Sequence, residues 1–130
     1  MDFMKEYEKW LASPALSQAE RQELEAIKGD AKEIESRFYG PLEFGTAGLR
    51  GTMYTGLHNM NIHVIRWATQ GFADVIAAEG EEGRQRGVAI CMDCRNHSME
   101  FARAAAEVCA ANGIHVRIFE SLRPTPELSF

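Results

Sequence analysis

The sequence predicts an α/β fold, a three-layer α/β/α sandwich with a mixed, partly parallel sheet, preceded by an N-terminal helical pair. Apolar residues recur at helical spacing up to residue 38, and the stretch 40–61 is rich in glycine and lacks this period. Beyond it, two strand-like runs, 88–93 and 115–121, flank an Ala-rich helical segment. Strand, helix and strand within about thirty residues form a βαβ unit, so we expect parallel strands with a right-handed crossover.

The first 38 residues predict two amphipathic helices. One spans residues 2–12 and stops before Pro14, because the residue preceding a proline avoids the helical region. The second begins with the capping-box spacing of Ser17 and Glu20, and Gly29-Asp30 is a candidate break within it. Two short helices bury too little surface to be stable alone, so we expect them to pack against a larger body.

The remaining chain predicts one α/β domain, residues 39–130, after a helical segment, residues 1–38. Asn61 is a candidate N-cap for a helix that runs from Ile62 to near Gly80. The following EGEEGRQRG predicts an exposed charged loop, and Ser98 is a candidate cap for the Ala-rich helix.

Composition excludes several classes of protein. The chain has 130 residues, 45% hydrophobic and 25% charged, which is typical of a soluble globular domain and not of a disordered or fibrous chain. The net charge of −5 disfavours nucleic acid as a partner, and no run has the length of a membrane span. Three cysteines without a secretory signal favour a reducing compartment, so we expect a cytoplasmic protein.

Arginine replaces lysine along most of the chain. From Arg37 onward all nine basic residues are arginines. Because the planar guanidinium binds phosphate or carboxylate through two parallel hydrogen bonds, this bias favours an anion site. Drift in surface composition is the structural alternative.

The segment from Phe44 to Gly51 has the chemistry of a loop that holds an anion. Its glycines allow close backbone approach, and Thr46 and Arg50 can donate hydrogen bonds to a phosphate. Glycines at this spacing also form bulges and turns, and the segment matches neither the P-loop nor the dinucleotide fingerprint. No G-x-G-x-x-G follows either parallel strand, which disfavours a Rossmann domain.

Several separated motifs together resemble a known family. EFGTAGLRG, the glycine-containing loop ending at Met60-Asn61, GVAICMDCRNHS and RPTPELSF occur in this order. They resemble the N-terminal domain of the α-D-phosphohexomutases, in the phosphoglucomutase, phosphomannomutase and phosphopentomutase group that carries extra N-terminal helices.

The resemblance implies a four-domain enzyme that moves a phosphoryl group between the 1-position and the 6- or 5-position of a sugar phosphate. A phosphoserine performs the transfer through a sugar bisphosphate, the intermediate and activator, and Mg²⁺ assists. Arg50 is implied as the catalytic residue facing the phosphoserine phosphate, and Thr46 lines the same phosphate-binding loop. An arginine there would stabilise charge spread over the phosphoryl oxygens.

The resemblance also implies that essential parts lie outside this chain. The family's serine follows the Pro-Thr-Pro by roughly two dozen residues in a Thr-Ala-Ser-His-Asn-Pro motif, and the magnesium ligands belong to later domains. The sequence starts a helix at Thr125-Pro126 that only Glu127 to Phe130 continue. We therefore expect a fragment that is inactive alone, partners with later domains and self-associates through faces meant for them.

Two positions depart from the family pattern Met-Gly-x-Gly-x-Asn-Arg-Met-Asn. Tyr54 stands where the group has glycine, and Asn59 where it has arginine. A different path of this loop would follow, and the identity of the sugar cannot be carried over.

Other residues are weaker candidates. Cys91 and Cys94 have CxxC spacing, but they lie on and just after a strand and no second ligand pair completes a metal site, so we expect no bound metal. Arg95, with Asp93, follows the carboxyl end of a predicted parallel strand, and Arg123 precedes Pro124; both arginines are second-rank candidates for the edge of the cleft. The structural alternative, which we favour for Asp93 and Arg95, is an ion pair that fixes the turn into the next helix. The histidines have no acid and nucleophile in a triad pattern.

A second hypothesis remains open at this point. The same Gly-rich loop could serve a stand-alone α/β module that binds a phosphorylated small molecule without catalysis.

Overall fold

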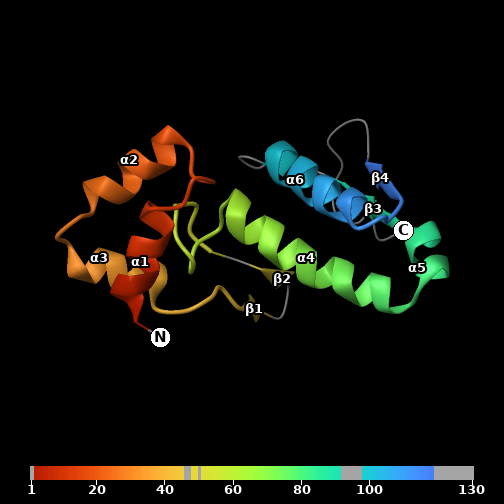
Figure 1. Ribbon diagram of the computed structural model, residues 1–130, viewed down its shortest axis with the longest axis horizontal. Helices are drawn as coiled ribbons and strands as arrows, with labels where there is room; N and C mark the ends of the chain where they lie inside the picture. Colours follow the sequence, from red (N-terminus) through yellow and green to blue (C-terminus); the bar gives the residue numbers. More distant parts are fainter. Residues whose placement is uncertain (1, 46–47, 50, 92–97, 119–130) are drawn as a thin grey trace. The chain divides into compact units, whose positions relative to one another are not determined.

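The computed structural model describes residues 2–45, 48–49, 51–91 and 98–118 (Figure 1). The chain divides into two compact units, residues 1–64 and 65–130. The predicted division into segments 1–38 and 39–130 stays a prediction. Within the described residues, no helix is long and apolar enough to cross a membrane.

The first unit begins with three helices, α1 (Phe3–Leu11), α2 (Gln18–Ala26) and α3 (Ala31–Phe38). The expected second helix is broken at its candidate break, so the predicted pair is a set of three. Gly29 has a φ of +90°, and the Asp30 side chain then accepts a hydrogen bond from the Glu33 amide to cap α3.

The capping box predicted at the start of α2 is present. The Ser17 hydroxyl accepts a hydrogen bond from the Glu20 amide at 3.2 Å. In return, the Glu20 carboxylate accepts one from the Ser17 amide at 3.0 Å. Two amides without partners inside the helix are thereby satisfied, which sets where α2 begins.

The helices of the first unit enclose an aromatic and aliphatic core. Phe38 is fully buried, and the edges of the Tyr7 and Trp10 rings pack against it at centroid distances of 5.8 and 5.6 Å. The Tyr7 hydroxyl donates to the Leu24 carbonyl at 2.8 Å, so this buried polar group has a partner. Burial of a side chain such as Phe38 contributes about 1.5–3 kcal/mol.

A short hairpin and a loop complete the first unit. Strand β1 (Phe44–Gly45) pairs antiparallel with β2 (Gly48–Leu49). The loop that follows ends at Asn61, whose side-chain oxygen accepts from the amides of His63 and Val64 at 3.1 and 3.0 Å. The predicted N-cap is confirmed, and α4 (Ile62–Ala78) begins there.

The second unit contains the predicted βαβ arrangement. Strands β3 (Val88–Ile90) and β4 (Val116–Ile118) are parallel, and α6 (Ser98–Ala111) lies between them in the chain. The register pairs Val88 with Val116 and Ile90 with Ile118. Both strands are shorter than expected within the described residues; positions 92–93 and 119–121 lie outside them.

One expectation for the second unit is wrong. The charged stretch after α4 is not a loop, because residues Glu81–Arg86 form helix α5. Its acids lie in the first turn and its arginines in the last, the distribution that the helix dipole favours. Arg86 also pairs with Glu82 one turn earlier.

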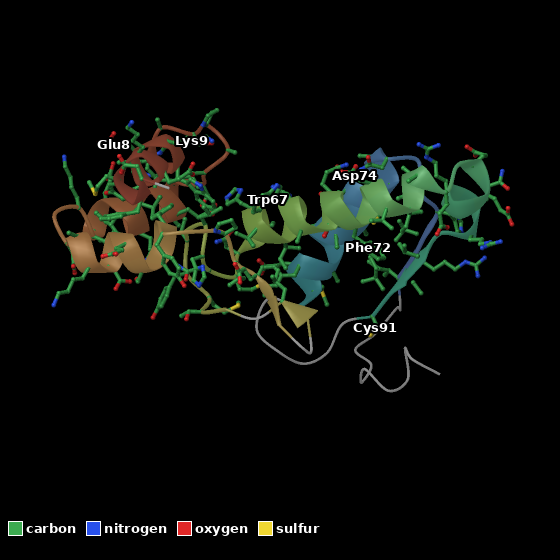
Figure 2. All side chains as sticks on the ribbon, turned by 90° about the horizontal axis from the view of Figure 1, so that it is seen from below. Glu8, Lys9, Trp67, Phe72, Asp74 and Cys91 are labelled. Atoms are coloured by element: carbon green, nitrogen blue, oxygen red, sulfur yellow. The ribbon has the colours of Figure 1, made fainter. Side chains whose placement is uncertain are left out.

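The core of the second unit is small. Ala73 of α4, Cys109 of α6 and Ile114 are buried together, and Val88 and Val116 pack against them from the sheet. Helix α4 carries two exposed aromatic side chains on different sides. Figure 2 shows Trp67 on the same side of the helix as Asp74, and Phe72 on the other side. Trp67 and Phe72 are 58% and 55% exposed.

Candidate functional site

The predicted site residues lie outside the described residues: the phosphate-binding candidates Thr46 and Arg50, and the second-rank cleft candidates Arg95 and Arg123. The same holds for Asp93 and Cys94. The structure instead describes the backbone on either side of the Gly-rich loop, and the groove beside it.

The β1–β2 hairpin brackets the predicted phosphate loop. Its register pairs Gly45 with Gly48 and Phe44 with Leu49, so residues 46 and 47 join the paired glycines. Gly51, directly after residue 50, packs closely against Leu42 and Met60. A Cβ at this position would be 3.1 Å from the Leu42 side chain and 3.3 Å from the Met60 amide nitrogen. Close packing therefore favours glycine at this position.

A groove of about 400 Å³ opens beside Gly51. Its lining includes Glu33 and Arg37 from α3, and Tyr54, His58 and Asn59 from the loop. Carboxylate, guanidinium, phenol and imidazole groups thus surround one hollow next to the predicted phosphate loop.

Arg37 is the cation of this groove, and it is buried. Its Nε lies 2.9 Å from a Glu33 oxygen, and one terminal nitrogen lies 3.7 Å from a Glu23 oxygen. The same nitrogen donates to the Thr55 carbonyl at 3.3 Å. Because two carboxylates neutralise it, Arg37 holds the loop in place and does not offer free charge to an anion.

The loop is fixed to α3 and the residues after it by His58. The His58 amide donates to the Arg37 carbonyl at 2.8 Å. Its Nδ1 lies 3.1 Å from the Gly40 carbonyl and 3.2 Å from that of Pro41, while Nε2 lies 2.7 Å from the Tyr39 hydroxyl. Since carbonyls only accept, Nδ1 is the donor in its two contacts. Both ring nitrogens of His58 thus take part in contacts that hold the loop.

The two departures from the family pattern both pack within this loop. The Arg37 guanidinium carbon lies 4.7 Å from the centre of the Tyr54 ring, a cation–π contact. Asn59 is buried, and its amide nitrogen donates to the Thr55 carbonyl at 3.4 Å. Tyr54 therefore ties the loop to α3, and Asn59 forms a contact within the loop.

Sequence reasoning missed Arg37 as a residue of the site. The spacing of Glu33 and Arg37, one helical turn apart, was available as a signal for their ion pair. The contacts with Tyr54 and Thr55 join positions that are far apart in the chain, so no local pattern indicates them.

A second polar contact, between Glu20 and His63, joins α2 to the start of α4 within the first unit. His63 Nε2 lies 2.7 Å from a Glu20 oxygen, and Trp10 packs edge-on against the His63 ring. Burial raises the pKa of the Glu20 carboxyl, but hydrogen bonds from Ser17 and the neighbouring His63 outweigh it and hold that pKa below its ordinary value.

The described cysteines and acids do not form a metal site. Cys91 and Cys109 are free thiols, and burial raises the pKa of the Cys109 thiol. Within residues 2–45, 48–49, 51–91 and 98–118, no group of three His, Cys, Asp or Glu side chains could hold a metal ion.

Known proteins resemble this chain over most of its length. A phosphopentomutase of Homo sapiens is 37% identical over 118 residues, covering 82% of this chain and 19% of the relative. A phosphomannomutase of Mycoplasma pneumoniae is 30% identical, with 93% of this chain and 22% of the relative covered. A phosphoglucomutase of Staphylococcus saprophyticus is 35% identical, with 76% of this chain and 17% of the relative covered.

The chain spans about a fifth of the length of these curated relatives. No solved structure gives a significant match. Residues 41–130 match the family model of the phosphoglucomutase/phosphomannomutase alpha/beta/alpha domain I. The expected resemblance is confirmed, and the chain belongs to the phosphoglucomutase/phosphomannomutase family, as its domain I.

Proposed function

We propose that the protein containing this chain is a phosphosugar mutase that moves a phosphoryl group between the 1-position and the 6- or 5-position of a sugar through a phosphoserine. The observation that carries the proposal is the domain I match over residues 41–130. The relatives are named for mutases of pentose, mannose and glucose phosphates, which supports a sugar phosphate substrate.

In this proposal the Gly-rich hairpin holds the transferred phosphate. Arg50 donates two hydrogen bonds to the phosphoryl oxygens, and Thr46 donates one from the same loop. The antiparallel pairing of Gly45 with Gly48 supports a hairpin at the Gly-rich segment. Arg95 and Arg123 are second-rank candidates at the edge of the cleft.

We further infer that the complete domain is a three-layer α/β/α sandwich. Its support is the parallel pairing of β3 with β4 and the packing of α4 and α6 residues against both strands. Parallel sheets are almost always covered on both faces, so helices on the second face are expected.

Magnesium and a sugar bisphosphate belong to the proposal as cofactor and intermediate. Among the described residues, no group of three His, Cys, Asp or Glu side chains is placed to hold a metal ion. We propose that the magnesium ligands, like the serine, lie on later domains. The free thiols of Cys91 and Cys109 support a reducing, cytoplasmic location.

The test is a coupled mutase assay on two proteins, the 130-residue chain and the product of its complete reading frame. Glucose, mannose and ribose 1-phosphates are offered with Mg²⁺ and the matching bisphosphate. We expect turnover only from the complete product, and Arg50→Gln lowers its kcat about 10²- to 10³-fold.

The matched control is Arg103→Gln, which removes the same charge from an exposed position on α6 and leaves kcat unchanged. Turnover by the 130-residue chain, or an unchanged kcat in Arg50→Gln, would contradict the proposal. Phosphate binding by the complete product without turnover would favour the stand-alone binding module.

A further inference from the structure

A second cluster of basic side chains surrounds a pocket in the second unit. The pocket has a volume of about 340 Å³. Its lining comes from the end of α5 and from the turn that leads into β4: Arg84, Gln85, Gly113, Ile114, His115 and Arg117. None of these residues is among those expected to bind the transferred phosphate.

Two of the lining residues come from one short segment: His115 directly precedes β4, and Arg117 lies in it. They are two positions apart, the spacing that places side chains on the same side of extended chain. The Arg117 Nε is 3.4 Å from the His115 Nε2. Among the described residues, no carboxylate lies within ion-pair distance of Arg117, so its charge is available to a ligand.

Arg84 reaches the pocket from α5. Its described ion-pair partner is Glu81, whose oxygen lies 4.0 Å away and whose side chain is 74% exposed. Such a long, exposed pair contributes little energy, so an anion in the pocket can compete with it. The lining therefore holds two arginines and no acid, with Gln85 as a further donor.

Backbone contacts fix the positions from which these side chains project. The His115 amide donates to the Arg84 carbonyl at 2.9 Å, and the Val88 amide donates to the His115 carbonyl at 2.8 Å. At Gly87, with a φ of +74°, a Cβ would lie 2.1 Å from the His115 carbonyl oxygen, so only glycine permits this approach. A frame that is formed before the ligand arrives lowers the entropic cost of binding.

The pocket lies at the amino ends of the parallel strands, whereas the cleft is expected beyond their carboxyl ends. β4 begins at Val116, so His115 marks the amino end of the parallel strands. Open α/β sheets bind their substrates beyond the carboxyl ends of the strands. In this chain the segments with Arg95 and Arg123 follow those carboxyl ends.

We propose that this pocket is a second anion site, which binds a small phosphate monoester through Arg84 and Arg117. Two guanidinium groups match the several oxygens of a phosphate dianion, and Gln85 can bind the uncharged part of the molecule. The volume suits a small metabolite. A nucleic acid is disfavoured because the chain as a whole is acidic, with a net charge of −5.

The test is an NMR titration of the ¹⁵N-labelled 130-residue chain with inorganic phosphate and with ribose 5-phosphate, at constant ionic strength set by chloride. We expect saturable shifts at the amides of Gly113, His115 and Arg117. Arg117→Gln and Arg84→Gln each weaken binding about tenfold or more, the effect of losing one charge-assisted contact. Arg84→Gln keeps the carbonyl that holds His115, so the frame stays intact.

The control Arg103→Gln removes an equal charge from an exposed site on α6 and is expected to bind like the wild type. Equal weakening in Arg103→Gln would indicate general electrostatics and overturn the proposal. So would shifts confined to residues 44–51 that Arg50→Gln abolishes and Arg117→Gln does not. Shifts confined to residues 44–51 would contradict the second anion site without contradicting the mutase proposal, so the experiment distinguishes the failure of one proposal from the failure of the other.

A measurement without variants uses phenylglyoxal, which modifies exposed arginines. Phosphate is expected to protect Arg84 and Arg117 and to leave Arg103 unprotected, as read by peptide mapping. Equal modification rates with and without phosphate would contradict the second site.

Discussion

The Arg37 guanidinium lies over the Tyr54 ring at 4.7 Å from its centre, and this contact joins helix α3 to the loop beside the predicted phosphate site. The same side chain pairs with Glu33 at 2.9 Å. A residue in the N-terminal helical segment therefore supports the loop that follows Gly51, and the helices contribute to the site through it.

Replacement of Arg37 tests this support. Arg37→Ala removes the stacking and leaves two half-exposed carboxylates without their partner, so we expect a loss of about 1–3 kcal/mol in the free energy of unfolding. Arg37→Lys keeps the charge without the planar fork and is expected to lose less. Urea unfolding followed by tryptophan fluorescence measures both.

Lys32→Ala is the matched control, because Lys32 is an exposed cation on the same helix. If Arg37→Ala is no less stable than Lys32→Ala, Arg37 does not hold the loop.

The Glu20–His63 contact predicts a dependence of stability on pH. Because the native pKa of Glu20 is lowered, the unfolded chain binds the proton more tightly, and the contact stabilises the fold above the ordinary glutamate pKa. This stability is lost as pH falls through the lowered native pKa. Glu20→Gln keeps an acceptor for the Ser17 amide but carries no charge.

We therefore expect the free energy of unfolding of the wild type to exceed that of Glu20→Gln by about 0.5–1.5 kcal/mol near pH 6, the worth of one charge-assisted hydrogen bond, with the difference lost as pH falls through the lowered native pKa of Glu20. Urea unfolding at a series of pH values provides the comparison. A difference that stays constant with pH would show that the charge of Glu20 does not contribute.

Two glycines of the second unit share a backbone conformation but differ in their surroundings. Gly80 and Gly87 have nearly the same backbone conformation, with φ and ψ of 84° and −161° and of 74° and −163°. A Cβ at Gly80 meets nothing within 4 Å, whereas at Gly87 it would lie 2.1 Å from the His115 carbonyl oxygen.

Both alanine variants carry a similar backbone strain of about 1–3 kcal/mol, so their difference isolates the contact with His115. We expect Gly87→Ala to lower the melting temperature well beyond Gly80→Ala, and to abolish the shifts of the second anion site. Equal melting temperatures would show that Gly87 does not approach the His115 carbonyl as described.

The two described thiols should differ in reactivity. Cys109 is 1% exposed and burial raises its pKa, while Cys91 is half-buried at the end of β3. We expect iodoacetamide to label Cys109 about 100-fold or more slowly than in the unfolded chain, because labelling requires local opening. Peptide mapping distinguishes the cysteines, and rapid labelling of native Cys109 would contradict its place in the core.

Local signals in the sequence were sufficient for many elements. The spacing of Ser17 and Glu20 predicted the start of α2, and Asn61 predicted that of α4, because caps are formed by residues adjacent in the chain. The parallel pairing of β3 and β4 was predicted by their order around one helix.

The errors and omissions also have physical causes. Helix α5 was missed because a short run of charges resembles a solvated loop, although the order of its acids and arginines complements the helix dipole. The groove at Arg37 and the pocket at Arg84 and Arg117 bring together residues distant in sequence. Only the tertiary fold places them together.

The most direct test of the assignment to a phosphoserine mutase is to read the source gene beyond the codon for Phe130. We predict an open frame that continues within roughly two dozen codons into a Thr-Ala-Ser-His-Asn-Pro-like motif, the family's phosphoserine site. A genuine stop codon at that position would contradict it, because the chain would then have no serine of that motif to carry the phosphoryl group.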